Sequence, residues 1–211
     1  MIGLEEWFAN FSQIARSWNS AEGLATVPRP HLEYAIWATL KAAEGMSILG
    51  GCVAHPIYRF YQYRKIVQSE VTPNTMKIIR NRSRHLQGRF LIAGVVVAPF
   101  LSRVYTHFMG FTDNEVKNKC YAIRCDAHEL TMDRCAVVCG FIGWYWKRFQ
   151  GAVDGINIGI AYALANIHIL APRTSPVLKD AIPTEQRYKT VEEVEEGRTK
   201  LERFMYVNDR K

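Results

Sequence analysis

The chain has 211 residues, 48% of them hydrophobic, and a formal net charge of +7, so its length fits one domain or two small ones. No recognised nucleic-acid motif accompanies the basic excess, and five cysteines do not form the fully paired framework of a small secreted protein. The mean hydropathy of −0.12 resembles that of a soluble protein, but the apolar residues are clustered. Their blocks predict an all-α, polytopic membrane protein, with a soluble all-α protein as the alternative.

The predicted organisation has three parts: an amphipathic N-terminal segment (1–30), a four-helix transmembrane domain (31–171) and a polar C-terminal tail (172–211). The spans are expected at about 34–54, 90–111, 130–146 and 151–171. Each carries small residues at four-residue spacing, a pattern that lets helices approach closely in lipid. These helix-packing positions are Ala43, Ser47, Gly51, Gly94, Ala98, Ser102, Ala136, Gly140, Gly151, Gly155, Gly159 and Ala163.

Residues 4–18 repeat large apolar side chains at helical spacing, which suits a helix in the membrane interface or one packed on a partner subunit. Glu5 and Glu6 precede any apolar run, so no signal peptide is expected. The segment also lacks the Arg-rich character of a cleaved mitochondrial presequence. Any targeting signal must therefore be internal.

The first span contains Lys41 and Glu44 on one helical face, and we expect His55-Pro56 to end it. A charge within a span costs about 2.5–3.5 kcal/mol on insertion scales, so such residues usually face protein or water. The pair therefore predicts a polar contact within a bundle. The alternative is that Lys41 lies near the helix end and snorkels.

A basic loop is predicted over 57–89, where eight cations and one anion account for the whole net charge. Four arginines lie just before the second span, at the level where anionic head groups would meet them. They are candidate ligands for phospholipid, including cardiolipin, or for acidic partner loops; the alternative is a topology signal alone. These arginines are Arg80, Arg82, Arg84 and Arg89.

The second span is interrupted by Pro99, which should kink it, and is followed by a polar segment over 112–134 with a net charge of −1. Cys120 and Cys125 lie in this segment. They could form a disulfide if the chain turns between them, since the two Cα atoms must come within about 7 Å. Two free thiols are the alternative.

The third apolar block, 135–146, has only 12 residues and needs several preceding residues to cross a bilayer. Lys147-Arg148 should form a turn before the fourth span, whose glycines 151, 155 and 159 are the strongest motif in the chain. A further helix is predicted from Thr190, on the solvent side and docked on a neighbour.

The positive-inside rule orients the spans, because the first and third connections are basic and the second is slightly acidic. The basic connections should face the cytoplasm or the mitochondrial matrix, and both termini should lie on the opposite side.

No catalytic, cofactor or metal site is predicted, because nucleotide loops, nucleophile elbows and paired-histidine helices are missing from the sequence. Cys120, Cys125 and His128 are a poor metal candidate with three ligands. A proton path could in principle involve four charged positions, although interior charges are more often structural. These are Lys41, Glu44, Arg103 and Asp154.

The segment 133–143, the turn at Lys147-Arg148 and the glycines from 151 to 159 together resemble the mitochondrial inner-membrane family of the preprotein translocase channel subunits. The same fold class contains a four-helix accessory subunit of respiratory complex I. The translocase signature requires an Arg and an Asp at fixed short spacing before Gly-Gly-x3-Gly. Here Arg148 and Asp154 are six apart, and only one glycine of the pair is present.

The resemblance implies a multi-pass protein of the mitochondrial inner membrane with both termini in the intermembrane space. The departures from the translocase signature count against an import channel more than against a scaffold. We therefore expect a non-catalytic accessory subunit of a respiratory chain complex, with complex I or its supercomplex contacts first. Its partners would be other membrane subunits and phospholipid, with no nucleic acid and no cofactor. The alternatives are a component of a protein-import channel and a small-molecule or proton carrier.

Overall fold

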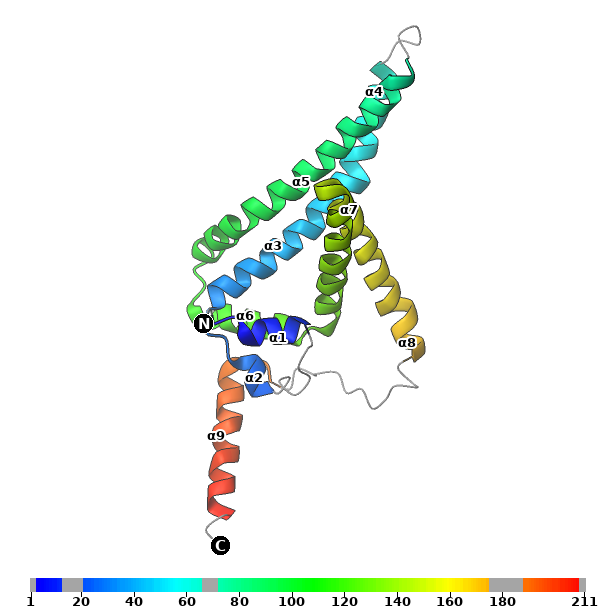
Figure 1. Cartoon of the computed structure of the whole chain (residues 1–211). Coiled ribbons are helices and arrows are strands. Elements are labelled where there is room, and N and C mark those ends of the chain that lie inside the picture. The colour runs from blue at the N-terminus through cyan, green and yellow to red at the C-terminus, as the bar shows by residue number, and fades with distance from the viewer. Residues whose placement is uncertain (1–2, 13–20, 66–71, 175–187, 209–211) are drawn as a thin grey trace. The chain divides into compact units, whose positions relative to one another are not determined.

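The computed structural model describes residues 3–12, 21–65, 72–174 and 188–208, and every regular element in them is a helix (Figure 1). The all-α prediction is confirmed. In chain order the elements are α1 (Glu5–Ser12), α2 (Ala21–Ala25), α3 (Pro30–Ile48), η2 (Leu49–Ala54), α4 (His55–Lys65), α5 (Pro73–Phe108), α6 (Asp113–Cys125), α7 (Ala127–Ala165), η4 (Asn166–Leu170), α8 (Ala171–Thr174) and α9 (Val191–Asn208). The predicted helix over 4–18 is described only as far as Ser12, and the rest lies outside the described residues.

The chain divides into two compact units that alternate along the sequence. Unit 1 comprises Met1–Ile36, Ser102–Leu130 and Thr174–Lys211, and unit 2 comprises Trp37–Leu101 and Thr131–Arg173. This grouping differs from the three consecutive parts expected from the sequence, because the N-terminal segment, the middle polar segment and the tail pack with one another.

The long helix α7 contains a chain reversal. Lys147 (φ −133°) and Arg148 (φ 55°) have non-helical backbone angles, and Figure 1 shows two arms meeting there. Residue 143 lies against 151, 139 against 155, and 135 against 159, so the arms run antiparallel. The predicted turn at Lys147-Arg148 is therefore confirmed, and α7 is a helical hairpin that belongs to unit 2 from Thr131 onward.

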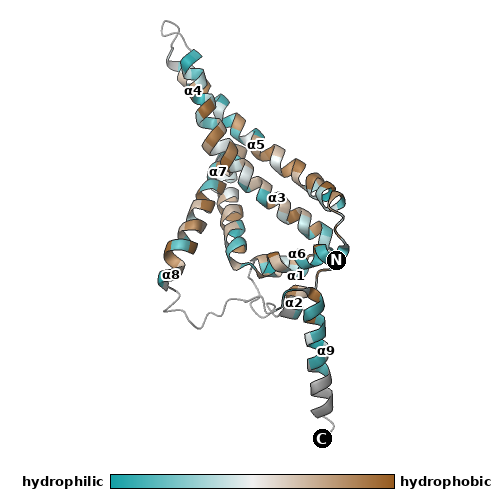
Figure 2. Cartoon of the chain, turned by 180° about the vertical axis from the view of Figure 1, so that it is seen from behind, coloured by the Kyte–Doolittle hydropathy of each residue, from teal (hydrophilic) through white to brown (hydrophobic). Residues whose placement is uncertain are grey.

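Two helices are long and apolar enough to cross a membrane: Asn74–Phe108, and Ala127–Arg173, which contains the hairpin. In each helix an apolar stretch of 18 residues meets this criterion, and only 28% and 33% of these two stretches are buried. Figure 2 shows hydrophobic residues along much of both helices. The four predicted spans are thus not all found by length and hydropathy. The helix over the first predicted span does not pass, since Lys41 and Glu44 lower its hydropathy.

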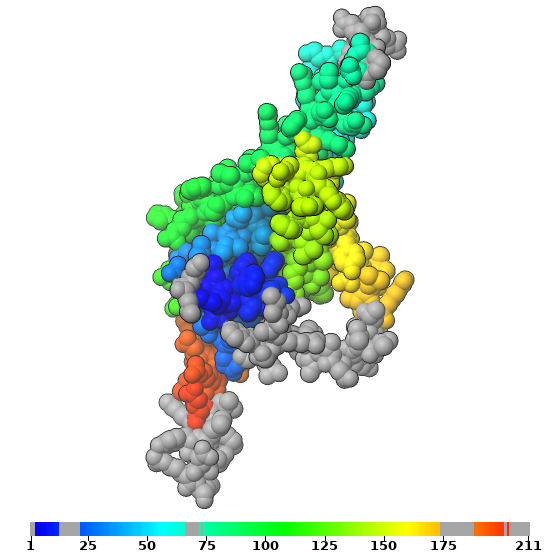
Figure 3. All heavy atoms as spheres, in the orientation of Figure 1, coloured from blue at the N-terminus to red at the C-terminus, as the bar shows by residue number. Residues whose placement is uncertain are grey.

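The prediction of a helix end at His55-Pro56 is wrong, and so is the prediction of a loop over the described residues 57–65 and 73–89, which are helical. A π-helical turn leads directly from α3 into α4, with the His55 N–H bonded to the carbonyl of Gly50, and α4 continues to Lys65. A widened turn can absorb the hydrogen bond that Pro56 cannot make. From Pro73 onward the segment belongs to α5, and Figure 3 shows α4 and the first part of α5 as adjoining masses of side chains.

Unit 1 has its own core, formed where α2, α6 and the first turns of α9 meet. Thr112 and Glu115 form a capping box at the start of α6, the helix that occupies much of the polar segment over 112–134. The backbone N–H of Val191 donates to Asn118 Oδ1 (2.9 Å), so the predicted C-terminal helix docks on its own chain. The buried core residues are Leu24, Ala25, Tyr121, Val191 and Val194.

Candidate functional site

The hairpin of α7 is held together by backbone contact at its glycines. A Cβ added to Gly151, Gly155 or Gly159 would overlap the carbonyl oxygen of Gly143, Cys139 or Cys135, respectively. No side chain longer than hydrogen fits there without separating the arms. The four-residue glycine ridge of the sequence is therefore the seam of this hairpin.

The other predicted small positions of unit 2 also face neighbouring helices. A Cβ on Gly94 would meet Met46 Cγ at 2.7 Å, and one on Gly140 would meet Ile156 Cγ1 at 2.8 Å. A Cβ on Gly51 would meet Asn157 Nδ2 at 2.5 Å and Val153 Cγ1 at 3.2 Å. Ser47, Ala98, Ala136 and Ala163 are buried, and Ala43 packs against the core of unit 2. Ser102, which falls in unit 1, is buried as well.

A buried polar cluster lies where α3 meets the first arm of α7. The Lys41 ammonium donates to Asp133 Oδ1 at 2.6 Å and to Glu44 Oε2 at 3.4 Å. Asp133 and Glu44 are 2% and 7% exposed, so two buried carboxylates share one ammonium. Among the described residues, no hydrogen-bond partner is found for Glu44 Oε1. The contact expected between Lys41 and Glu44 is present, and Asp133 is its third member.

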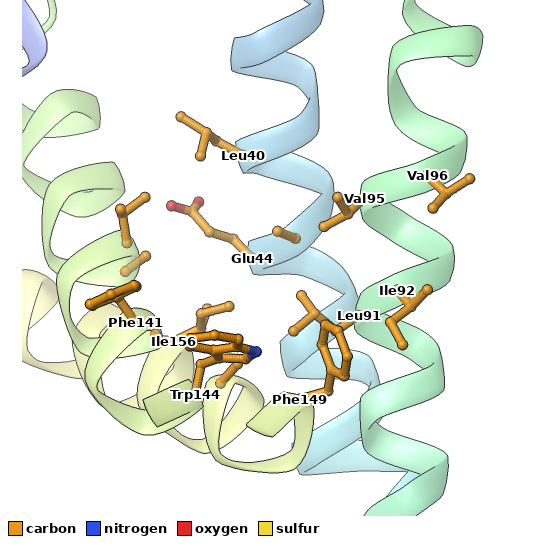
Figure 4. A pocket seen from close by; sticks show the side chains of 15 residues that line it. Leu40, Glu44, Leu91, Ile92, Val95, Val96, Phe141, Trp144, Phe149 and Ile156 are labelled. Atoms are coloured by element: carbon orange, nitrogen blue, oxygen red, sulfur yellow. The ribbon is translucent and has the colours of Figure 1, made fainter. Parts of the chain in front are cut away.

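Beside this cluster lies a cavity of about 540 Å³ within unit 2. Its walls come from α3, α5 and both arms of α7, and Glu44 is the only ionisable group among its lining residues. Figure 4 shows the Glu44 carboxylate extending from α3 toward the arm that carries Phe141, above Trp144. The cavity is within the size range of small-molecule pockets.

Unit 1 is organised around the buried side chain of Arg124. Its guanidinium donates to both carboxylate oxygens of Glu33, at 2.6 and 2.7 Å, and to the carbonyl oxygens of Leu24 and Thr26, each at 3.0 Å. The backbone carbonyl of Arg124 accepts from Asn10 Nδ2 at 3.1 Å. One residue of α6 thus links α1, α2 and the start of α3.

The sequence matches one protein family over most of its length. The model of the DUF1757 family, described as a protein of unknown function, matches residues 7–166. The chain belongs to this family. No curated protein matches it. The family match extends from α1 into η4, so it contains Glu33, Arg124, the polar cluster and the hairpin, and it ends before α9.

The candidate disulfide within the family match does not form, because Cys120 and Cys125 are both free thiols. They lie on the single helix α6, where five residues separate Cα atoms by about 7.5 Å along the axis, beyond the reach of a disulfide. Burial raises the pKa of Cys120 to about 12, and its Sγ donates to the carbonyl of Pro30 at 3.3 Å. Burial also raises the pKa of Cys125.

The structure does not join the other candidate ligands into one site. No group of three or more metal-binding side chains occurs within the described ranges, which include Cys120, Cys125 and His128. Arg80 and Arg84 lie on one face of α5, whereas Arg82 and Arg89 lie on the opposite face by helical geometry. The four arginines therefore surround the helix instead of forming one patch.

Residues of the proposed proton path are also not brought together. Lys41 and Glu44 contact each other, but Arg103 and Asp154 are exposed and belong to different units. The roles of Glu33, Arg124 and Asp133 were not predicted from the sequence. The available signal for Asp133 was its position as a charged residue inside the predicted third span, where a charge usually faces protein or water.

Proposed function

We propose that the chain is a multi-pass membrane scaffold: a non-catalytic accessory subunit of a mitochondrial respiratory chain complex, with complex I or its supercomplex contacts as the first candidate. The mitochondrial part of this proposal rests on the resemblance of residues 133–159 to the inner-membrane family described above. In the proposed membrane arrangement, the four spans are α3, α5 and the two arms of the α7 hairpin.

The observation that carries the proposal is the low burial of the two most apolar helices. A core helix of a soluble protein would have its apolar stretch largely buried. In α5 and in the helix that contains the hairpin, about seven-tenths of that stretch is not buried. Exposed faces of this size need lipid or the helices of a partner. The large exposed side chains include Phe100, Leu101, Phe141, Tyr145, Trp146 and Ile158.

The division into units supports the proposed orientation. The segments assigned to the intermembrane space are the N-terminal segment, the connection that contains α6, and the tail, and all three belong to unit 1. The basic segment of α4 and α5 and the turn at Lys147-Arg148 belong to unit 2 and would face the matrix. Segments that pack together in one compact unit can lie on the same side of a membrane, as the proposed orientation requires.

The cavity favours a scaffold over the import-channel and carrier alternatives. A path for a polypeptide or a polar solute needs polar groups along its walls. The lining here is apolar except for Glu44.

A topology experiment tests the membrane arrangement. Protease added to sealed mitoplasts should cut the tail beyond Pro183 and spare the segment that contains Arg64 and Arg82. Cleavage at either arginine would contradict the orientation.

The order of defects after depletion separates the three functions. A scaffold should lose its respiratory complex first, with import falling later as the membrane potential drops. An import component would lose precursor import first, and a carrier would lose one metabolite flux while both other activities persist.

A further inference from the structure

Glu44 Oε1 is buried and no hydrogen-bond partner for it is found among the described residues, and the side chain of Asp133 interacts with the same carboxylate. Its partner Lys41 is engaged more closely by Asp133, at 2.6 Å against 3.4 Å, so Glu44 is the less compensated of the two carboxylates. Leaving a buried polar atom unpaired is destabilising, and more so for a charged group. A further group that donates a hydrogen bond to Oε1 would remove this cost.

The cavity beside Glu44 determines what kind of group this is. Leu91, Val95 and Phe141 are among its walls, and nearly all of its accessible lining surface is apolar. An ordinary ion or sugar would lose its hydration there without replacement. A molecule that fits must present hydrocarbon to the walls and one hydrogen-bond donor to Glu44.

We propose that this cavity binds an amphiphile with an apolar chain and a hydroxyl head group, and that the hydroxyl donates to Glu44 Oε1. A neutral hydroxyl suits the cluster because Lys41 already supplies the cation, and a fatty-acid carboxylate would be repelled by Glu44 and Asp133. Side chains at the rim are open to an entering chain: Val96 is 55% exposed and Phe141 is 66% exposed. The inference does not depend on the proposed respiratory role.

The test uses the purified full chain in phosphatidylcholine nanodiscs and two photoactivatable probes, palmityl alcohol and palmityl methyl ether. The probes share the same hydrocarbon chain, but only the alcohol has a donor. Covalent labelling is measured by mass spectrometry of peptides from α5 and from the first arm of α7. We expect the alcohol to label cavity residues about tenfold more strongly than the ether, the ratio given by one hydrogen bond to a charged acceptor.

Three variants test whether the difference in labelling between alcohol and ether depends on the cavity and on the Glu44 acceptor. Glu44→Leu removes the acceptor and should lower alcohol labelling to the level of the ether. Val95→Trp should fill the cavity and abolish labelling by both probes. Val97→Trp is the matched control, since residue 97 is exposed on the same helix and does not line the cavity.

The proposal is overturned if alcohol and ether label the wild-type chain equally, or if Glu44→Leu leaves their ratio unchanged. It is also overturned if Val95→Trp and Val97→Trp behave alike while both remain folded. Should Val95→Trp fail to fold, Val137→Trp fills the cavity from the opposite wall and is judged by the same criterion.

Discussion

Each unit of this protein contains a buried ion pair, and the two pairs differ in how completely their hydrogen bonds are satisfied. In unit 1, Arg124 makes four side-chain hydrogen bonds and both oxygens of Glu33 accept. In unit 2, one Lys41 ammonium serves Asp133 and Glu44, and one oxygen of Glu44 is left over.

The difference follows from the chemistry of the two cations. A guanidinium has five donors in a fixed plane and can bind a carboxylate and two carbonyls together, whereas an ammonium is a compact charge with three donors. Buried pairs with complete partners fix local structure. We therefore assign the Arg124 pair to the architecture of unit 1 and the Glu44 side of the other cluster to ligand binding.

The largest effect is expected from Arg124→Leu. The variant leaves the Glu33 carboxylate buried without its cation, and removal of one partner of such a pair costs about 3–5 kcal/mol. Unfolding measured in detergent should show this loss of stability. Cys120, the buried thiol of unit 1, should also be alkylated faster.

Two controls isolate the charge. The double variant Arg124→Leu/Glu33→Leu should recover much of the loss, because no unpaired charge is left buried. Arg198→Leu breaks an exposed pair with Glu202 and should change nothing measurable. A double variant as unstable as the single one would show that Arg124 acts through its carbonyl contacts and not through Glu33.

Substituting Gly155 should damage the other unit. Gly155→Leu places a side chain against the Cys139 carbonyl, and we expect a loss of about 3 kcal/mol, the upper part of the range for overpacking. Cys139 should become more reactive while Cys120 stays protected. Gly45→Leu is the matched control, since a Cβ at Gly45 meets nothing within 4 Å. Equal damage from both variants would contradict a close-packed seam.

These features differed in how far the sequence predicted them. The seam was predictable because Gly151, Gly155 and Gly159 repeat along one helix face, which is local information. The Arg124 contact with Glu33 was not, because 91 positions separate the two residues and no spacing links them. The helical extension through α4 was missed because charge was taken to indicate a loop, although Arg, Lys and Gln are good helix formers.

The two carboxylates of unit 2 should respond differently to neutralisation. Asp133→Asn weakens the short bond to Lys41 and should cost about 1.5 kcal/mol, the low end for a hydrogen bond to a charged group. Glu44→Gln should cost less, since its bond to Lys41 is longer and one of its oxygens already lacks a partner. Both are measured by unfolding in the same detergent. The reverse order would make Glu44 the structural member of the cluster.

A smaller effect is expected at Cys120 as pH rises. Burial raises the pKa of this thiol to about 12 from the ordinary 9.0, so the folded chain retains its proton where the unfolded chain begins to release it. Stability from this group is therefore constant below pH 9 and declines above it. Maleimide should label Cys120 slowly at pH 8 in the folded protein and rapidly in denaturant. Equal rates would show that the thiol is accessible.

The most direct test of the proposed function is a native gel of mitochondrial membranes in mild detergent, with each band identified by mass spectrometry. If the exposed faces of α5 and the hairpin contact partner helices, the protein should co-migrate with a respiratory complex, and Gly155→Leu should reduce that band while Gly45→Leu leaves it intact. Migration of the wild-type chain only as a free species, or only with the import machinery, would contradict the accessory-subunit account.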